Sequence, residues 1–159
     1  MGVLCKDAVP GRGAESAGAF ARAEGWLFMV DFVTSRLSQA PDGVAPDGTE
    51  VRLIGALPAA SMARFDLPAG AVSHAVTHRT VEEIWLFLEG EGELWRKHGE
   101  REAVIAVAPG VAVTMPLGTH FQFRAGLSGP LRFVAATFPP WPGENEAVRV
   151  EGRWAATVD

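Results

Sequence analysis

The sequence has no tyrosine and only one cysteine, Cys5. A single cysteine cannot form a disulfide within the chain, and this fits a reducing compartment, so we expect a cytoplasmic protein. The N-terminus shows no long apolar segment followed by a small-residue cleavage site, so the sequence predicts no secretory signal.

The chain also lacks a long apolar run and a stripe of basic residues. No stretch approaches the length needed to cross a bilayer, so no membrane partner is expected. Lys and Arg number 14 against 19 Asp and Glu, which gives a formal net charge of -5. Without clustered Lys and Arg, we expect no nucleic-acid partner.

What is present is typical of a folded globular domain. Apolar residues make up 48% of the chain and charged residues 21%, a balance unlike that of disordered segments. The length of 159 residues suits one domain.

The two ends of the chain differ from its centre. Residues 1–28 are rich in Gly, Ala and small polar residues and show no strand alternation. We interpret them as a poorly ordered or loosely docked extension, or as the result of a mis-assigned start; the alternative is a strand over residues 26–33. The folded domain would take in residues 29–159, with a core of about 50–138 and a C-terminal segment, 139–159, that wraps its surface.

The central region reads as a series of short strands. The first clear run is VRLIGAL from residue 51, the last is PLRFVAATF over residues 130–138, and Gly- and Pro-rich turns separate the runs. No long segment repeats apolar residues at helical spacing. The C-terminal segment PPWPGENEAVRVEGRW cannot be a central strand, because its prolines remove ladder donors. The sequence therefore predicts an all-β barrel or a double-sheet sandwich.

The stretch GAVSHAVTHRTVEEIWLFLEG has the spacing of a metal-binding motif, G-x5-H-x-H-x(3,4)-E-x6-G. Gly70 opens it, His78 and Glu83 stand at the second His and the Glu, and Gly90 closes it. The first His is replaced by Val76.

A second motif follows, with the spacing G-x5-P-x-G-x2-H-x3-N. Gly110, Pro116 and Gly118 match it, whereas Phe121 and Ala125 stand at the His and Asn positions. Together the two motifs resemble those of the cupin superfamily, and the chain is most similar to small single-domain bacterial cupins of the mannose-6-phosphate-isomerase-like kind.

The resemblance implies a cupin jelly-roll barrel, also called a double-stranded β-helix, that often forms a homodimer. It also implies three His and one Glu that hold a divalent metal such as Zn, Mn, Fe or Ni. Only His78 and Glu83 of that set are present here. The metal site is therefore degenerate, and a bound metal is an open expectation.

Other side chains could complete the ligand set. His74 shares the inward parity of His78, but it lies about 13 Å away along a regular strand. His120 faces away from the interior if Phe121 faces inward. A slip of one residue would bring His120 and Gln122 inward. The candidate ligands are thus His78, Glu83, Gln122 and His120, and the alternative is that His78 and Glu83 bind only each other or a buried water.

The barrel interior is also a candidate pocket. Trp85 and Phe87 share the parity of Glu83, and Phe121 and Phe123 should join them inside. An aromatic-lined cavity with few polar groups is the usual form of a small-molecule site; the alternative is that these rings simply fill the core. The candidate ligand-binding residues are Trp85, Phe87, Phe121, Gln122, Phe123 and Arg124, the last as an anchor for an anionic group at the barrel mouth.

Two classes of function follow. The first is a small-molecule enzyme, a sugar or organic-acid isomerase- or cyclase-like catalyst, with His78 as general base and Glu83 as its acid/base partner. The second is a non-catalytic, metal-free barrel that binds a ligand or serves a structural role. A sugar-nucleotide epimerase of the related metal-free type depends on a tyrosine, and this chain has none.

Overall fold

A computed structural model describes residues 32–159. The prediction for residues 1–28 lies outside the described residues, as does most of the alternative strand over residues 26–33. Phe32 and Val33, at the end of that alternative strand, are exposed and belong to no strand. No helix in the described range is long and apolar enough to span a bilayer.

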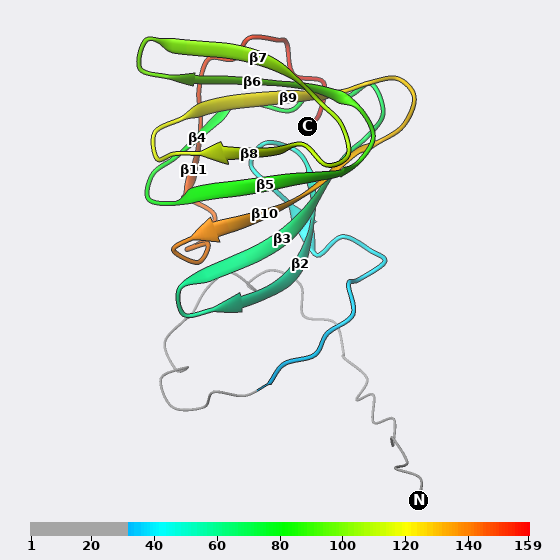
Figure 1. Ribbon diagram of the computed structural model, residues 1–159, viewed down its shortest axis with the longest axis vertical. Helices are drawn as coiled ribbons and strands as arrows, with labels where there is room; N and C mark the ends of the chain where they lie inside the picture. Colours follow the sequence, from blue (N-terminus) through cyan, green and yellow to red (C-terminus); the bar gives the residue numbers. More distant parts are fainter. Residues whose placement is uncertain (1–31) are drawn as a thin grey trace, which may run out of the picture.

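The described chain folds into two antiparallel β-sheets (Figure 1). In spatial order, the six-stranded sheet contains β1 (Gly43–Val44), β2 (Glu50–Leu57), β3 (Ala60–Leu67), β10 (Leu131–Phe138), β5 (Glu82–Glu89) and β8 (Ala112–Met115). The five-stranded sheet contains β11 (Ala147–Arg149), β4 (Val76–His78), β9 (His120–Ala125), β6 (Gly92–His98) and β7 (Arg101–Val107). The prediction of an all-β fold is confirmed.

The regular strand that was assumed for His74 and His78 is much shorter in the structure. The run over residues 71–78 forms a strand only at Val76–His78, with an isolated bridge between Val72 and Arg124. The backbone N–H of His74 donates instead to the carbonyl of Asp47, so this part of the chain leaves the ladder. β11 lies at the edge of its sheet, beside β4, so the C-terminal segment contributes no central strand.

The core lies between the inner faces of the two sheets. Along β5, Glu83, Trp85 and Phe87 are buried while the residues between them are exposed, which is the alternation of a strand with one buried face. The Trp85 ring stacks on Phe133 at a centroid distance of 4.3 Å and meets Phe121 edge-on at 5.1 Å. Each such buried aromatic contributes roughly 1.5–3 kcal/mol, so this cluster is a large part of the hydrophobic core of the barrel.

Gly90, which closes the first motif, is required by packing as well as by conformation. Its φ is +79°, a region that favours glycine. A Cβ at this position would lie 2.1 Å from the carbonyl oxygen of Pro130. The motif glycine therefore permits the close approach of the β5–β6 turn to the start of β10.

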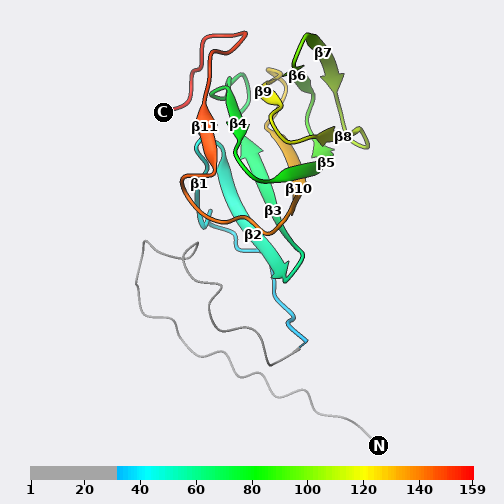
Figure 2. The ribbon, with the colours of Figure 1, turned by 90° about the vertical axis from the view of Figure 1, so that its left-hand side faces the viewer.

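The C-terminal segment packs against the outer face of the five-stranded sheet. Figure 2 shows this segment running beside β11 and β4. The backbone N–H of Trp154 donates to Gln122 Oε1 at 2.9 Å, and the guanidinium of Arg124 lies 4.6 Å from the centroid of the Trp154 ring. This face of the barrel is therefore covered by the chain itself.

Candidate functional site

His78 and Glu83 meet inside the barrel, although they belong to different sheets. His78 ends β4 and Glu83 lies near the start of β5, so the chain crosses from one sheet to the other between them. Their Nδ1 and Oε2 atoms are 3.8 Å apart. The two residues are only 9% and 4% exposed. The structure thus brings together the two predicted catalytic residues.

Aromatic rings enclose the His78 imidazole. Phe121 meets it edge-on at a centroid distance of 5.2 Å, and Trp141 does so at 5.3 Å. The backbone N–H of Trp141 donates to Ser61 Oγ at 2.9 Å, which fixes the start of the loop after β10. Trp141 is half-buried and therefore covers the His78 end of the barrel.

Glu83 is held in a protonated state by its surroundings. Burial raises the pKa of Glu83 to about 8, and the nearby carboxylates of Asp47 and Glu146 raise it as well. The indole Nε1 of Trp85 donates to Glu83 Oε2 at 2.7 Å and opposes that rise. A carboxyl group with this pKa carries its proton at pH 7 for most of the time.

The pKa of His78 is displaced in the opposite direction. Burial lowers the pKa of His78 to about 4, and the carboxylate of Glu146 only partly offsets this. The imidazole is therefore neutral at pH 7. Although 3.8 Å would suit an ion pair, the site at neutral pH is an uncharged carboxylic acid beside an uncharged imidazole.

Glu146 fixes the corner between His78 and Glu83. Its carboxylate accepts hydrogen bonds from the Thr80 N–H at 2.5 Å, the Thr80 hydroxyl at 2.8 Å and the Val81 N–H at 2.9 Å. Burial raises the pKa of Glu146, but these hydrogen bonds outweigh that effect and hold it below its ordinary value.

Sequence reasoning missed two carboxyl groups of this region. Glu146 follows a Pro- and Gly-rich stretch, and no motif singles it out. Asp47 is buried and accepts hydrogen bonds from the N–H and hydroxyl of Thr49, and burial raises the pKa of Asp47. The Asp-Gly-Thr spacing is the only local signal, because Asp often accepts such bonds from the residue two positions on.

The proposed additional metal ligands do not reach the pair. Val76 lies opposite Phe121 and Thr77 opposite His120 in the β4–β9 ladder. Phe121 is therefore inside and His120 outside, and the slipped register is not observed. Two metal positions of the cupin motif are filled by hydrocarbon side chains.

Gln122 also faces away from His78. Its Nε2 donates to the carbonyls of Ser73 and Trp154, both at 2.8 Å, and its Oε1 accepts from the Trp154 N–H. Every polar atom of this amide is thus bound to backbone under the C-terminal segment. In residues 32–159 no three His, Cys, Asp or Glu side chains are grouped closely enough to hold a metal ion. The donor set does not fit the resident divalent metal that the cupin motif implies.

The predicted ligand-binding residues separate into three groups. Trp85 and Phe121 border the His78–Glu83 pair. Phe87 and Phe123 lie in the packed core, each in contact with Phe133. The remaining two, Gln122 and Arg124, are on the outer face.

Arg124 is engaged at that outer face. Its Nε donates to Glu93 Oε2 at 2.6 Å, and its guanidinium lies over the Trp154 ring. The anionic anchor predicted at the barrel mouth is therefore not placed near His78, because residue 124 shares the outward parity of His120 and Gln122.

Solved structures of other proteins share this architecture. The capsular polysaccharide assembling protein CapF from Staphylococcus aureus matches with a TM-score of 0.58 and 14% identity, over 68% of this chain and 33% of CapF. KdgF from Halomonas sp. matches with a TM-score of 0.52 and 18% identity, over 66% of this chain and 88% of KdgF. A Klebsiella pneumoniae protein with a double-stranded β-helix domain matches with a TM-score of 0.53 and 16% identity, over 68% and 89% of the two chains.

These similarities define the class of fold. The chain has the cupin fold, a double-stranded β-helix, as its two motifs predicted. It spans about a third of the length of CapF. No protein-family model and no curated protein matches the sequence.

Proposed function

We propose that this cupin binds a small uncharged organic molecule at the His78–Glu83 pair and moves a proton on it. The observation that carries the proposal is the 3.8 Å approach of Nδ1 to Oε2 between two groups whose pKa values are displaced in opposite directions. A buried acid beside a buried base is the arrangement needed for concerted general acid–base catalysis.

The surrounding charges indicate the substrate class. Asp47 and Glu146 are the charged groups that act most on the pair, and both are carboxyl groups. An anionic substrate, whether an organic acid or a phosphorylated sugar, would meet like charge here. An uncharged hydroxy ketone or hydroxy aldehyde fits better, because it offers a carbonyl to a donor and a hydroxyl to an acceptor.

The His78–Glu83 pair can supply and take up every proton that an isomerisation of such a molecule requires. The neutral His78 removes the proton from the carbon that bears the hydroxyl, while the Glu83 carboxylic acid gives its proton to the carbonyl oxygen. The product is an enediol facing an imidazolium and a carboxylate, which stabilise each other at short range. His78 then returns its proton to the former carbonyl carbon, and Glu83 recovers a proton from the other hydroxyl.

Solvent isotope exchange tests this proposal without knowledge of the natural substrate. Dihydroxyacetone in D₂O should gain deuterium at carbon in the presence of the protein, as followed by proton NMR. His78→Gln and Glu83→Gln should each lower the exchange rate by at least about a hundredfold. His120→Gln, on the outer face, is the matched control and should leave the rate unchanged. No exchange with a panel of uncharged hydroxy carbonyl compounds would refute the catalytic proposal.

A second candidate is a non-catalytic barrel. The packing of Trp85 against four phenylalanine rings favours it, because a filled interior leaves little room for a ligand. Under this alternative, dihydroxyacetone would cause neither isotope exchange nor chemical-shift changes at His78. Shift changes at His78 without exchange would instead indicate a binding protein.

A further inference from the structure

An open groove lies at the side of the barrel where the free edges of the two sheets meet. β8 is the last strand of the six-stranded sheet and β7 the last strand of the five-stranded sheet, and both lie on the same side of the barrel (Figure 2). The groove has a volume of about 310 Å³, at the lower end of the range for small-molecule sites. Its lining residues are Ile84, Arg96, Ile105, Ala112, Val113 and Thr114.

The walls of the groove are mostly aliphatic. Ile84 on β5 lies opposite Thr114 on β8, and Ala112 follows two residues away on the same face of β8. Ile105 on β7 supplies the wall from the other sheet. Ile84 is 52% exposed, so apolar surface in the groove is in contact with water and favours a ligand with an apolar part. The groove is also separate from the His78–Glu83 pair, because Ile84 is on the exposed face of β5 and Glu83 on its buried face.

Arg96 is the one charged residue among those that line the groove. It lies opposite Phe121 in the β6–β9 ladder, so its side chain starts on the inner face of the five-stranded sheet. From there it extends to the other sheet, where its Nη1 donates to the Thr114 carbonyl at 3.0 Å. Among residues 32–159, Thr114 is its only hydrogen-bond partner. The guanidinium is thus held at the β8 edge of the groove, and its other N–H groups are available to a ligand.

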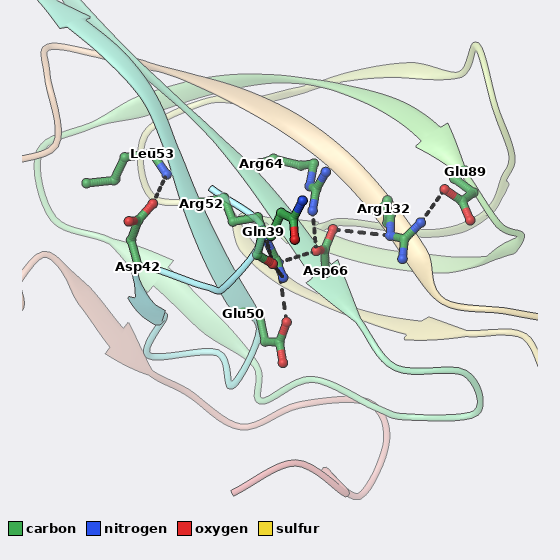
Figure 3. A network of polar contacts seen from close by, with 9 residues as sticks. All are labelled: Gln39, Asp42, Glu50, Arg52, Leu53, Arg64, Asp66, Glu89 and Arg132. Carbon is green, nitrogen blue, oxygen red and sulfur yellow. Dashed lines mark hydrogen bonds and ion pairs between the residues drawn. The ribbon is translucent and has the colours of Figure 1, made fainter. Parts of the chain in front are cut away.

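Arg96 differs from the other arginines in this respect. Within the described residues, every other arginine that is buried or half-buried forms an ion pair with a carboxylate. The largest such network, on the outer face of the six-stranded sheet, balances three arginines with three acids (Figure 3); its members are Arg52, Arg64, Arg132, Glu50, Asp66 and Glu89. A half-buried guanidinium has lost part of its hydration, so a counter-ion would stabilise it. At Arg96 the described chain does not supply one.

The surroundings of the groove favour a small ligand over a peptide. An extended peptide would pair with the free backbone groups of an edge strand. β8 is only four residues long, and its Thr114 carbonyl already accepts a hydrogen bond from Arg96. The acidic side chain nearest to Ile84 on the exposed face of β5 is Glu82, whose Oε1 accepts a hydrogen bond from the Leu117 N–H at 3.3 Å instead of pairing with Arg96. The groove therefore offers an aliphatic wall and one cation to a molecule of modest size.

We propose that this groove binds a short aliphatic carboxylate. The carboxylate pairs with the Arg96 guanidinium, whose planar fork of N–H groups matches two carboxylate oxygens. The alkyl chain lies against Ile84, Ile105 and Ala112. None of the lining residues is aromatic, so the walls suit a slender chain rather than a ring that stacks. This site does not depend on the proposed reaction, because its ligand is an anion bound outside the barrel.

Titration of the full chain with two probes, followed by backbone-amide NMR, tests this proposal. Hexanoate should shift the signals of Ala112 and Thr114, and it should bind about tenfold more tightly than hexanamide, which has the same chain without the charge. Arg96→Gln should abolish this difference, because the glutamine amide can still donate to the Thr114 carbonyl but has no charge. Butanoate should bind roughly fourfold more weakly than hexanoate, since an open groove buries part of each of the two missing CH₂ groups.

Two control substitutions separate this site from other effects. Arg149→Gln removes the same charge from β11, at the opposite edge of the five-stranded sheet from β7, and should leave the preference for hexanoate unchanged. His78→Gln should also leave it unchanged, which separates this test from that of the proposed function. Equal binding of hexanoate and hexanamide by the wild-type chain would overturn the proposal without the need for any variant. A preference for hexanoate that persists in Arg96→Gln would overturn it as well.

Discussion

Glu83 and Trp85 are neighbours on the same face of β5, and the Trp85 indole donates a hydrogen bond to the Glu83 carboxyl at 2.7 Å. No other hydrogen bond between described residues reaches the Glu83 side chain. The strand therefore supplies both the buried acid and the one group that moderates its pKa. The first prediction follows from this pair.

Replacing Trp85 by Phe should raise the pKa of Glu83 above about 8, because the hydrogen bond from the indole lowers it. Carbon-13 NMR of the labelled glutamate carboxyls, followed between pH 5 and 10 (about three units below to two above), would measure the midpoint. Trp95→Phe is the control, since the Trp95 indole donates to Glu102 instead. A midpoint that falls in Trp85→Phe would show that the hydrogen bond does not have this effect.

The stability of the protein should decrease between about pH 6.5 and 8. The folded Glu83 keeps its proton up to about pH 8, whereas the unfolded one loses it near 4.5, so rising pH favours unfolding over that interval. The effect of His78 on stability has the opposite sign between about pH 4 and 6.5, because only the unfolded imidazole is protonated in that interval. The two effects cancel between about pH 4.5 and 6.5, and from pH 6.5 to 8 the Glu83 effect lowers the free energy of unfolding by about 2 kcal/mol.

Urea unfolding at half-unit pH steps would measure this decrease. Glu83→Gln should remove the loss of stability above pH 6.5, because the amide does not titrate. His78→Gln should make the loss begin near pH 4.5, since the opposing effect is gone. A wild-type curve that stays level from pH 6.5 to 8 would contradict the raised pKa of Glu83.

Glu146→Gln should destabilise the corner between β4 and β5. The amide can accept fewer of the three hydrogen bonds from Thr80 and Val81, and the loss of charge-assisted bonds costs about 1–3 kcal/mol. Urea unfolding at pH 6 would measure the change in the free energy of unfolding. Glu144→Gln, an exposed residue of the same loop, should have almost no effect.

Trp141→Ala should expose the His78 imidazole. Burial is the main cause of its lowered pKa, so removal of the covering ring should raise the pKa of His78 from about 4 toward 6.5. Proton NMR of the histidine ring signals would give the titration midpoint. Trp154→Ala, which removes a ring from the opposite side of the five-stranded sheet, should leave the midpoint where it is. Equal midpoints in Trp141→Ala and wild type would mean that Trp141 does not control access to His78.

Metal analysis should give far less than one equivalent of bound ion. His78 and Glu83 supply only two donors, and no third His, Cys, Asp or Glu among residues 32–159 completes the group. Two donors make a weak metal site. Elemental mass spectrometry of protein purified without an affinity tag, before and after soaking with Mn, Fe, Ni or Zn, would measure the content. A stoichiometric metal that disappears in His78→Ala would show that the ligand set has been rebuilt.

The local rules of the sequence account for much of the fold. The alternation of β5 placed Glu83, Trp85 and Phe87 on one buried face, because strand side chains alternate with a period of two. The same rule placed Phe121 inside and His120 outside. The resemblance of the two motifs to those of cupins then predicted the cupin fold, and one motif glycine, Gly90, stands where a Cβ would meet the backbone of Pro130.

The site was only partly predictable, because local rules connect only residues that are close together in the sequence. His78 and Glu83 are five positions apart, so a motif could connect them. Trp141 and Glu146 reach the site from the far end of the chain; Glu146 and Thr80 are 66 positions apart. No local sequence pattern predicts such a contact, because the contact depends on how the loop after β10 crosses the barrel.

The sequence by itself thus determined the strands, their inward faces and the loss of two metal-binding histidines, because these depend on residue type and short-range spacing. The tertiary structure alone decided three further features. It buried Gln122 under the C-terminal segment, placed Trp141 over His78, and displaced the pKa values of His78 and Glu83 in opposite directions. Each of these depends on which distant segment excludes water from a side chain, and water exclusion is a property of the packed fold rather than of any short stretch of the chain.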